Sequence, residues 1–138
     1  MNAWNVGDSA QLSKTVTEKD IAGFAEITLD NNPVHFDPAY AAGTIFKGCI
    51  AHGVLSVGLI SAVIGTQIPG PGAIYRAQSV QFHLPVRAGD TITATATITR
   101  FEDGIMELET IVTNQHGRKV VSGIAEIGYR PEKFKSAA

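Results

Sequence analysis

Residues 49–68 read CIAHGVLSVGLISAVIGTQI, a stretch of 20 residues without a formal charge. A stretch of this length could cross a membrane. Small and polar residues interrupt it throughout, however, among them Gly53, Ser56, Gly58 and Ser61, and we expect no membrane span. A helix that is small and apolar on all sides is typical of a protein core. The segment therefore predicts a buried helix that a sheet wraps on most sides.

The residues after this helix have the period of β-strands. Residues 75–84 alternate, and residues 91–99 alternate more cleanly, with threonine at every odd position and Ile or Ala at every even one. Glu102-Asp103-Gly104 and Gln115-His116-Gly117 are typical of tight turns between antiparallel strands. The second half of the chain is therefore predicted to be an antiparallel meander.

The residues before the long helix predict one strand and two shorter helices. A strand over residues 10–16 leads into a helix over residues 18–27, and Thr17 with Asp20 has the spacing of a capping box at its start. A second short helix is expected over residues 38–42. One long buried helix and several antiparallel strands together indicate an α+β fold, which we expect to form one domain over residues 1–138.

Composition excludes several classes of function. The net charge is −2 and the pI is about 6.0, with no run of Lys or Arg, so neither a nucleic acid nor an anionic membrane is expected as a partner. Cys49 is the only cysteine and residues 1–5 do not resemble a signal peptide, which favours the cytoplasm. No metal is expected, because the histidines lack the spacing of metal ligands. They are His35, His52, His83 and His116.

The segment 28–37, TLDNNPVHFD, carries the most informative polar residues. Asp30 and His35 stand five positions apart, and Asn32-Pro33 between them is a turn signal that restricts the backbone. A carboxylate and an imidazole held in one turn can serve as an acid/base pair. The backbone N–H of Gly53, at the expected start of the long helix, is a candidate donor to a developing oxyanion.

At this point the chain resembles the MaoC-like (R)-specific enoyl-CoA hydratases over nearly its whole length. The resemblance implies a hot-dog fold, in which a curled antiparallel sheet wraps a long central helix. One position departs from the family pattern, because Leu29 stands where the family usually has glycine. The matching motifs are Val6-Gly7-Asp8, Asp30-x-Asn32-Pro33-x-His35-x-Asp37-Pro38, Ala51-His52-Gly53 and Phe82-x-x-Pro85-Val86-x-x-Gly89-Asp90.

The resemblance implies the reversible syn hydration of a trans-2-enoyl-CoA to an (R)-3-hydroxyacyl-CoA, a hydro-lyase reaction that supplies precursors for polyhydroxyalkanoate synthesis. Asp30 is expected to be the principal base and His35 its partner in holding water. Gly53 is expected to donate to the thioester oxygen, Ser61 matches a serine near the family's active site, and Asn32 is expected to brace the turn. No cofactor is implied beyond the CoA thioester, which is the substrate.

Three other functions remain open from the sequence. They are a 3-hydroxyacyl-carrier-protein dehydratase, a hot-dog thioesterase and a non-catalytic subunit that binds acyl thioesters. Thioesterases of this fold tend to place a carboxylate on or near the central helix, and residues 49–68 contain none. His52 is interpreted as a structural histidine. A homodimer is expected, because a curled sheet leaves free edges and apolar surface.

Overall fold

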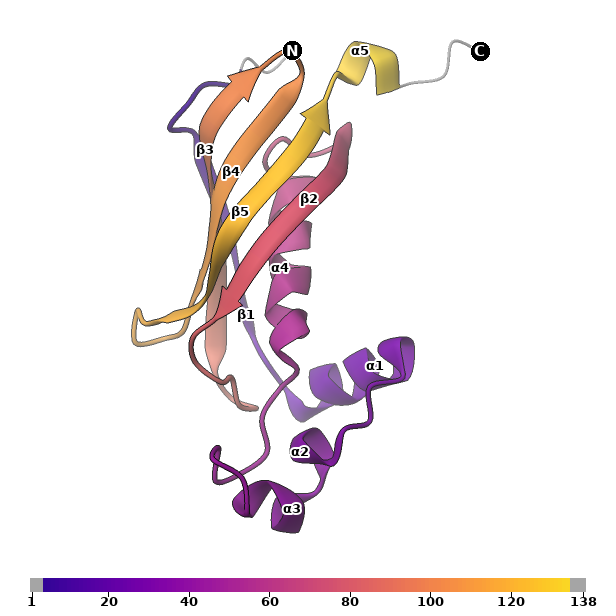
Figure 1. The fold of residues 1–138 in the computed structure, drawn as a ribbon, viewed down its shortest axis with the longest axis vertical. Helices are drawn as coiled ribbons and strands as arrows, with labels where there is room; N and C mark the ends of the chain where they lie inside the picture. Colours follow the sequence, from indigo (N-terminus) through magenta and orange to yellow (C-terminus); the bar gives the residue numbers. More distant parts are fainter. Residues whose placement is uncertain (1–3, 135–138) are drawn as a thin grey trace.

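The computed structural model describes residues 4–134. It shows one five-stranded antiparallel sheet curled around one long helix (Figure 1). The strand order in the sheet is β1-β3-β4-β5-β2. This is the α+β hot-dog arrangement that the sequence predicted. The strands are β1 (Ser9–Thr15), β2 (Ala73–Phe82), β3 (Thr91–Glu102), β4 (Ile105–Thr113) and β5 (Lys119–Tyr129); the helices are α1 (Glu18–Thr28), α2 (Pro33–Phe36), α3 (Pro38–Ala42), α4 (Gly53–Thr66) and α5 (Pro131–Phe134).

Helix α4 packs in the concave face of the sheet. Its residues Ile60, Val63 and Ile64 are fully buried among the even-numbered residues of β3 and the inward residues of β4 and β5. Each side chain of this size contributes about 1.5–3 kcal/mol when it is buried. The helix is not covered on every side, however. Its uncovered side carries Val54, Gly58, Ser61 and Gly65, so the sheet covers most sides of the helix, as predicted, and leaves one side open.

The outer face of β3 is a row of threonines, as the alternation predicted. Their hydroxyl groups pair across to β1 on the convex side of the sheet. Ser13 Oγ lies 2.6 Å from Thr93 Oγ1, and Thr15 Oγ1 lies 2.7 Å from Thr91 Oγ1. The strict register between the two strands places these groups directly opposite each other.

Local signals in the sequence predicted most helix ends and turns correctly. Thr17 and Asp20 form the predicted capping box of α1, and Asp37 caps α3. Asp103 and Gly104 both have positive φ, of 54° and 73°, as a tight hairpin between β3 and β4 requires.

Two predictions were wrong in detail. Residues 33–36, expected as part of a turn, form one turn of helix, because Pro33 takes its first position and Asn32 caps it. The strand predicted over residues 75–84 runs from Ala73 to Phe82, and a bulge between Tyr75 and Ala77 breaks its alternation.

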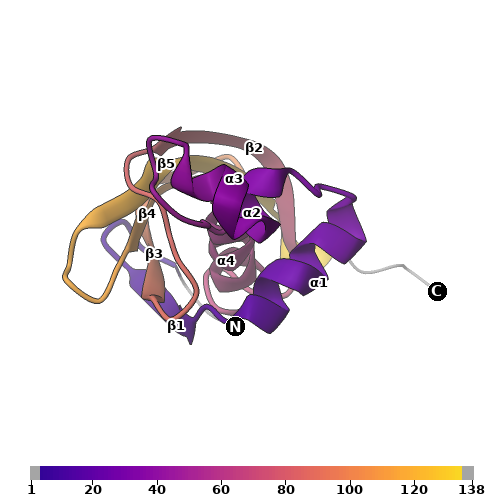
Figure 2. The same ribbon diagram turned by 90° about the horizontal axis from the view of Figure 1, so that it is seen from below.

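Helices α1, α2 and α3 form a separate layer at one end of the sheet, beside the N-terminal end of α4 (Figure 1). Seen from below, they lie across the end of the curled sheet, with α4 behind them (Figure 2). Within residues 4–134, no helix has the length and apolar character that crossing a membrane requires.

The turn before β3 is held by Asp90. Its carboxylate accepts hydrogen bonds from the Arg87 N–H, at 2.9 Å, and from the Gln115 amide, at 2.8 Å. Desolvation acts to raise the pKa of Asp90. The two hydrogen bonds and the nearby charges of Arg87 and His116 outweigh it, so the pKa of this carboxyl lies below its usual value.

We expect truncation in the core of α4 to be costly. Ile60→Ala should lower the free energy of unfolding by about 2–5 kcal/mol, because the packed sheet cannot close over the lost methylene groups. Denaturant unfolding of the purified variant measures this change. Val6→Ala, at a residue that is 65% exposed, is the matched control and should change stability little. An equal effect of both substitutions would contradict the assigned core.

The low pKa of Asp90 predicts a pH-dependent contribution to stability. A carboxyl with a lowered folded-state pKa stabilises the fold above its unfolded pKa of about 3.9, and this contribution is lost as the pH falls through the folded pKa. Asp90→Asn should therefore lower the free energy of unfolding by about 1 kcal/mol at pH 7. Urea unfolding along a pH series should show this difference narrowing below about pH 4. A difference that stays constant with pH would contradict the role given to the charge.

Candidate active site

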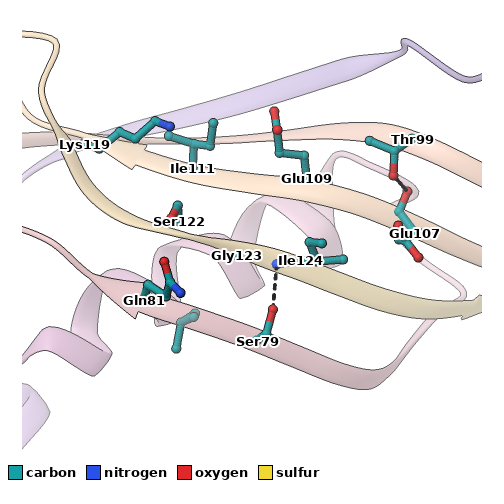
Figure 3. A pocket seen from close by; sticks show the side chains of 11 residues that line it. Ser79, Gln81, Thr99, Glu107, Glu109, Ile111, Lys119, Ser122, Gly123 and Ile124 are labelled. Atoms are coloured by element: carbon teal, nitrogen blue, oxygen red, sulfur yellow. Dashed lines mark hydrogen bonds between the residues drawn. The ribbon is translucent and has the colours of Figure 1, made fainter.

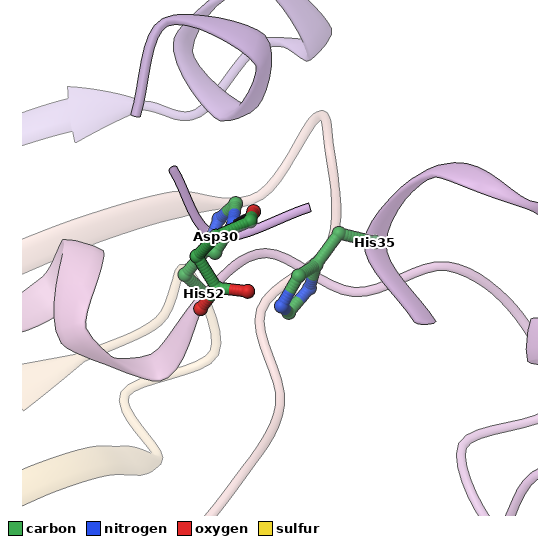
Figure 4. A group of neighbouring side chains, drawn as sticks. All are labelled: Asp30, His35 and His52. Carbon is green, nitrogen blue, oxygen red and sulfur yellow. Dashed lines mark hydrogen bonds between the residues drawn. The ribbon is translucent and has the colours of Figure 1, made fainter. Parts of the chain in front are cut away.

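Asp30, His35 and His52 come together at the junction between the helical layer and α4 (Figure 4). Asp30 follows α1, His35 lies in α2, and His52 is the N-cap residue of α4. One ligand atom of each residue lies within 4.8 Å of those of the other two. The imidazole rings of His35 and His52 are stacked, with centroids 3.8 Å apart and planes inclined by 32°. Thus Asp30 and His35, the predicted pair, are neighbours in space.

The position of Asp30 follows from the way α1 ends. Leu29, the C-cap residue, has a φ of 68°, in the left-handed region. Glycine enters this region freely, whereas another residue does so at a cost of about 1–2 kcal/mol. This explains why a glycine fits here and why leucine is the departure noted in the sequence. The Asp30 carboxylate then accepts a hydrogen bond from the Asn32 N–H, at 3.2 Å, and the side chain itself is exposed.

His35 is held in one tautomer by the main chain. Its Nδ1 lies 2.7 Å from the carbonyl oxygen of Ile50. A carbonyl can only accept, so Nδ1 carries the hydrogen, and in the neutral ring Nε2 keeps its lone pair. A half-buried imidazole with a free Nε2 lone pair beside a carboxylate can take a proton from a bound water.

His52 is the residue whose importance the sequence understated. It is 3% exposed, and its Nε2 donates to the backbone carbonyl of Asp30, at 2.9 Å. This bond ties the start of α4 to the Asp30 turn, which agrees with the structural role expected. Its Nδ1 is buried and has no hydrogen-bond partner among the described residues. The motif Ala51-His52-Gly53 was the only sequence signal, and it did not reveal the stacking on His35.

Gly53 is the first residue of α4, so its N–H has no acceptor within the helix. A Cβ at this position would lie 2.9 Å from two carbons of the Phe82 ring. A side chain here would therefore collide with that ring. The close packing leaves a backbone N–H, at the positive end of the helix dipole, next to the cluster of Asp30, His35 and His52.

The remaining predicted site residues lie outside this cluster. The Asn32 side chain accepts from the Val34 N–H, at 3.1 Å, and so braces the turn as expected. Ser61 is exposed on α4, about two turns beyond Gly53. The structure thus gives Asn32 a defined contact and leaves a role for Ser61 toward substrate as a prediction.

Two hollows adjoin the site, and a third lies away from it. An apolar cavity of about 260 Å³ adjoins His52 and Gly53, with Phe82, Leu84 and Val120 in its walls. A second hollow, of about 280 Å³, is lined by His35, Phe36, Cys49 and others. The largest, of about 550 Å³, lies on the face of the sheet opposite α4 and shares no lining residue with the cluster (Figure 3). We assign no role in the chemistry to this outer hollow.

Two histidines and a carboxylate are also a possible set of metal ligands, which the sequence spacing did not predict. Tetrahedral zinc ligands at about 2.0–2.1 Å from the ion lie about 3.3 Å from one another. The three ligand atoms here are separated by up to 4.8 Å, so these side chains would have to move closer together to enclose such an ion. The arrangement fits proton transfer better than metal binding.

Comparison with known proteins identifies the family. Residues 5–120 match the model of the MaoC like domain. The chain is 43% identical to the (R)-specific enoyl-CoA hydratase of Aeromonas caviae over 124 residues, which cover 88% of this chain and 92% of that enzyme. It is 58% identical to the enzyme of the same name from Rhodospirillum rubrum over 93 residues, which cover 67% of this chain and 65% of that enzyme, just under two thirds of its length.

Solved structures give the same result. The (R)-hydratase of A. caviae involved in PHA biosynthesis superposes with a TM-score of 0.88 at 39% identity, over 94% of this chain and 100% of that one. The unliganded R-hydratase of Pseudomonas aeruginosa superposes with a TM-score of 0.86 at 43% identity, over 91% of this chain and 82% of that one. Because the family model matches most of its length and its fold matches those of these hydratases, the chain belongs to the MaoC-like domain family.

Proposed function

We propose that this protein catalyses the reversible syn hydration of a trans-2-enoyl-CoA to an (R)-3-hydroxyacyl-CoA. The observation that carries the proposal is the placement of Asp30 and a tautomer-fixed His35 together, beside the free N-terminus of α4. The names of the A. caviae and R. rubrum relatives support the same reaction. A third relative, 51% identical, is named 3-hydroxybutyryl-CoA dehydratase, which is the reverse reaction on a short acyl chain.

Hydration adds the elements of water across the C2–C3 double bond. A water held between the Asp30 carboxylate and His35 Nε2 gives up one proton as its oxygen bonds to C3. The electron pair of the double bond moves toward the thioester carbonyl and forms an enolate. A proton from the same pair of groups then bonds to C2 and the enolate collapses. Asp30 is assigned as the principal base and His35 as its partner in orienting the water and moving the proton.

The Gly53 N–H is assigned to the thioester oxygen. Negative charge grows on that oxygen only as the enolate forms, so a fixed donor there stabilises the transition state more than the substrate. A donor of this kind is worth about 3 kcal/mol. The N-terminus of α4 is the positive end of the helix dipole, and it further stabilises the negative charge on the thioester oxygen.

The same geometry accounts for syn addition. Asp30 and His35 lie side by side, with a ligand atom of each within 4.8 Å of the other (Figure 4). The oxygen at C3 and the hydrogen at C2 then come from one side of the double bond. The names of the relatives support the (R) configuration of the product. We propose that the product is consumed by an enzyme that uses (R)-3-hydroxyacyl-CoA, such as one that polymerises it.

The first test removes each member of the pair. Asp30→Asn and His35→Ala should each lower kcat for crotonyl-CoA hydration by about 100- to 10,000-fold, because each loses a proton-transfer group. Asp30→Asn keeps the carbonyl that holds His52, so its fold should survive. The loss of the conjugated-thioester absorbance measures the rate, and an (R)-specific dehydrogenase identifies the product.

His116→Ala is the matched control for this test, because His116 lies exposed in the turn between β4 and β5. It should leave the rate unchanged. Near-normal turnover by Asp30→Asn would sink the assignment of the base. Tight binding of crotonyl-CoA by an inert wild-type protein would favour a non-catalytic binding subunit.

A second candidate function is a dehydratase acting on acyl-carrier protein. Relatives with that name from Solanum lycopersicum and Arabidopsis thaliana are 36% and 37% identical to this chain. The chemistry at Asp30 and His35 would be the same and only the carrier would differ. Faster turnover of a carrier-bound substrate than of the CoA substrate would favour it. Helix α4 carries no carboxylate, which counts against the thioesterase, and release of free thiol would reveal that activity.

The protein is proposed to act as a homodimer in which two sheets join through their β2 edges. Strand β2 ends the sheet, and its outer edge is unpaired in the single chain. Apolar residues around this edge and around the site are exposed, among them Phe82 at 54%, Leu29 at 80% and Val54 at 57%. A second copy placed here would cover them, together with the open side of α4, and would exclude water from Asp30.

The homodimer predicts a specific sensitivity on α4. Gly58→Glu should convert a dimer of twice the 14.6 kDa chain mass into monomers, because the single chain leaves open space around this position while a partner would not. Light scattering coupled to size exclusion measures the mass. Ile124→Glu, on the opposite face of the sheet, is the control and should remain dimeric. A monomeric wild type at micromolar concentration would contradict the proposal.

A further inference from the structure

The tautomer of His35 depends on one carbonyl in an irregular segment. The Ile50 oxygen that accepts from Nδ1, at 2.7 Å, lies between α3 and α4, where residues 43–52 form neither helix nor strand. No ladder of hydrogen bonds therefore fixes this carbonyl. Its position depends on the contacts that tie the segment to the rest of the protein.

The Arg87 side chain makes two of those contacts, beside the bond from the Ile50 N–H to the Val34 carbonyl, at 3.3 Å. Its Nη1 donates to the Cys49 carbonyl, at 3.1 Å, and its Nη2 donates to the Phe46 carbonyl. A Cβ at Gly48 would lie 3.1 Å from the same Nη1, so the guanidinium is packed directly on the segment. These two carbonyls flank the residues that lead to Ile50. The planar fork of an arginine presents N–H groups to both carbonyls in a fixed geometry, whereas the ammonium of a lysine is a compact charge on a flexible stem.

Arg87 is itself fixed at its main chain. Its N–H donates to the Asp90 carboxylate, at 2.9 Å, and Asp90 also accepts from Gln115. The neighbouring Val86 carbonyl accepts from the Ala51 N–H, at 2.7 Å. Within residues 4–134, the guanidinium forms no salt bridge with a carboxylate. The guanidinium donates instead to the carbonyls of Phe46 and Cys49, in the segment that carries the Ile50 carbonyl.

We propose that Arg87 is a positioning residue for the hydration reaction. It holds residues 46–50 so that the Ile50 carbonyl accepts from His35 Nδ1 and leaves Nε2 free for the water. This inference rests on the proposed function of His35. Without the guanidinium, the Ile50 carbonyl moves relative to His35, and the ring is free to take the other tautomer or to rotate. The loss then falls on the chemical step and not on the binding of substrate.

Steady-state kinetics separate an effect on the chemical step from an effect on the binding of substrate. Arg87→Ala should lower kcat for crotonyl-CoA by about 10- to 100-fold, the effect of a small misplacement of a catalytic group, with KM changed by less than about twofold. Arg87→Lys should recover only part of the rate. Guanidinium ion added to Arg87→Ala should also restore part of it. Arg118→Ala, in the exposed turn between β4 and β5, is the control and should behave as wild type.

A structural signature separates positioning from general stability. Nitrogen NMR of ¹⁵N-labelled histidine should show His35 with hydrogen on Nδ1 in the wild type and a mixture of tautomers in Arg87→Ala, with His35→Ala identifying the signal. An unchanged His35 tautomer, or a normal kcat with only a lower melting temperature, would overturn the proposal. If Arg87→Ala does not fold, the same measurements on Arg87→Lys decide it.

The two proposals fail in different ways. A wild-type protein that does not hydrate crotonyl-CoA contradicts the proposed substrate or reaction, while the tautomer of His35 in the Arg87 variants still decides the link from Arg87 to His35. An active wild type with an unaffected Arg87→Ala variant contradicts only the role of Arg87.

Discussion

The fold depends on the burial of α4, a helix that contains no charged residue. Helix α4 exposes no formal charge to water, so the chain must cover it, and the curled sheet does this with the inward residues of β3, β4 and β5. The direction of the helix then fixes where its N-terminus emerges. That end lies beside the helical layer and not under the sheet (Figure 1). The first N–H groups of α4 therefore face the layer whose residues include Asp30 and His35. One packing requirement thus positions both the core and the N–H group proposed as the oxyanion donor.

Much of this fold could be predicted from the sequence because its signals are local. The capping box at Thr17, the alternation over residues 91–99 and the Asp103-Gly104 turn each depend on residues within a few positions of one another. The errors arose where neighbours distant in the sequence decide the outcome. The bulge in β2, which breaks the predicted alternation, is set by its pairing with β5.

The same distinction between local signals and distant neighbours applies to the site. The pairing of Asp30 with His35 was predicted, chiefly from the resemblance, and the cap formed by Asn32 followed from its place before Pro33. The stacking of His52 on His35 was not predicted, because it joins residues 17 positions apart through the fold of the helical layer. The carbonyl partners of both histidines were hidden as well. A sequence gives no sign of which main-chain oxygen will face a side chain, since every residue carries the same one.

Those main-chain partners have a consequence for the way this site tolerates change. The two acceptors that orient His35 and His52 are the carbonyls of Ile50 and Asp30, and no replacement of a side chain deletes a carbonyl. A point mutation can therefore shift these oxygens but cannot remove them. The course of the main chain therefore sets the tautomers of the two rings. The side chain at position 50 can be replaced to change the surroundings of His35, and the hydrogen bonds of both histidines are retained.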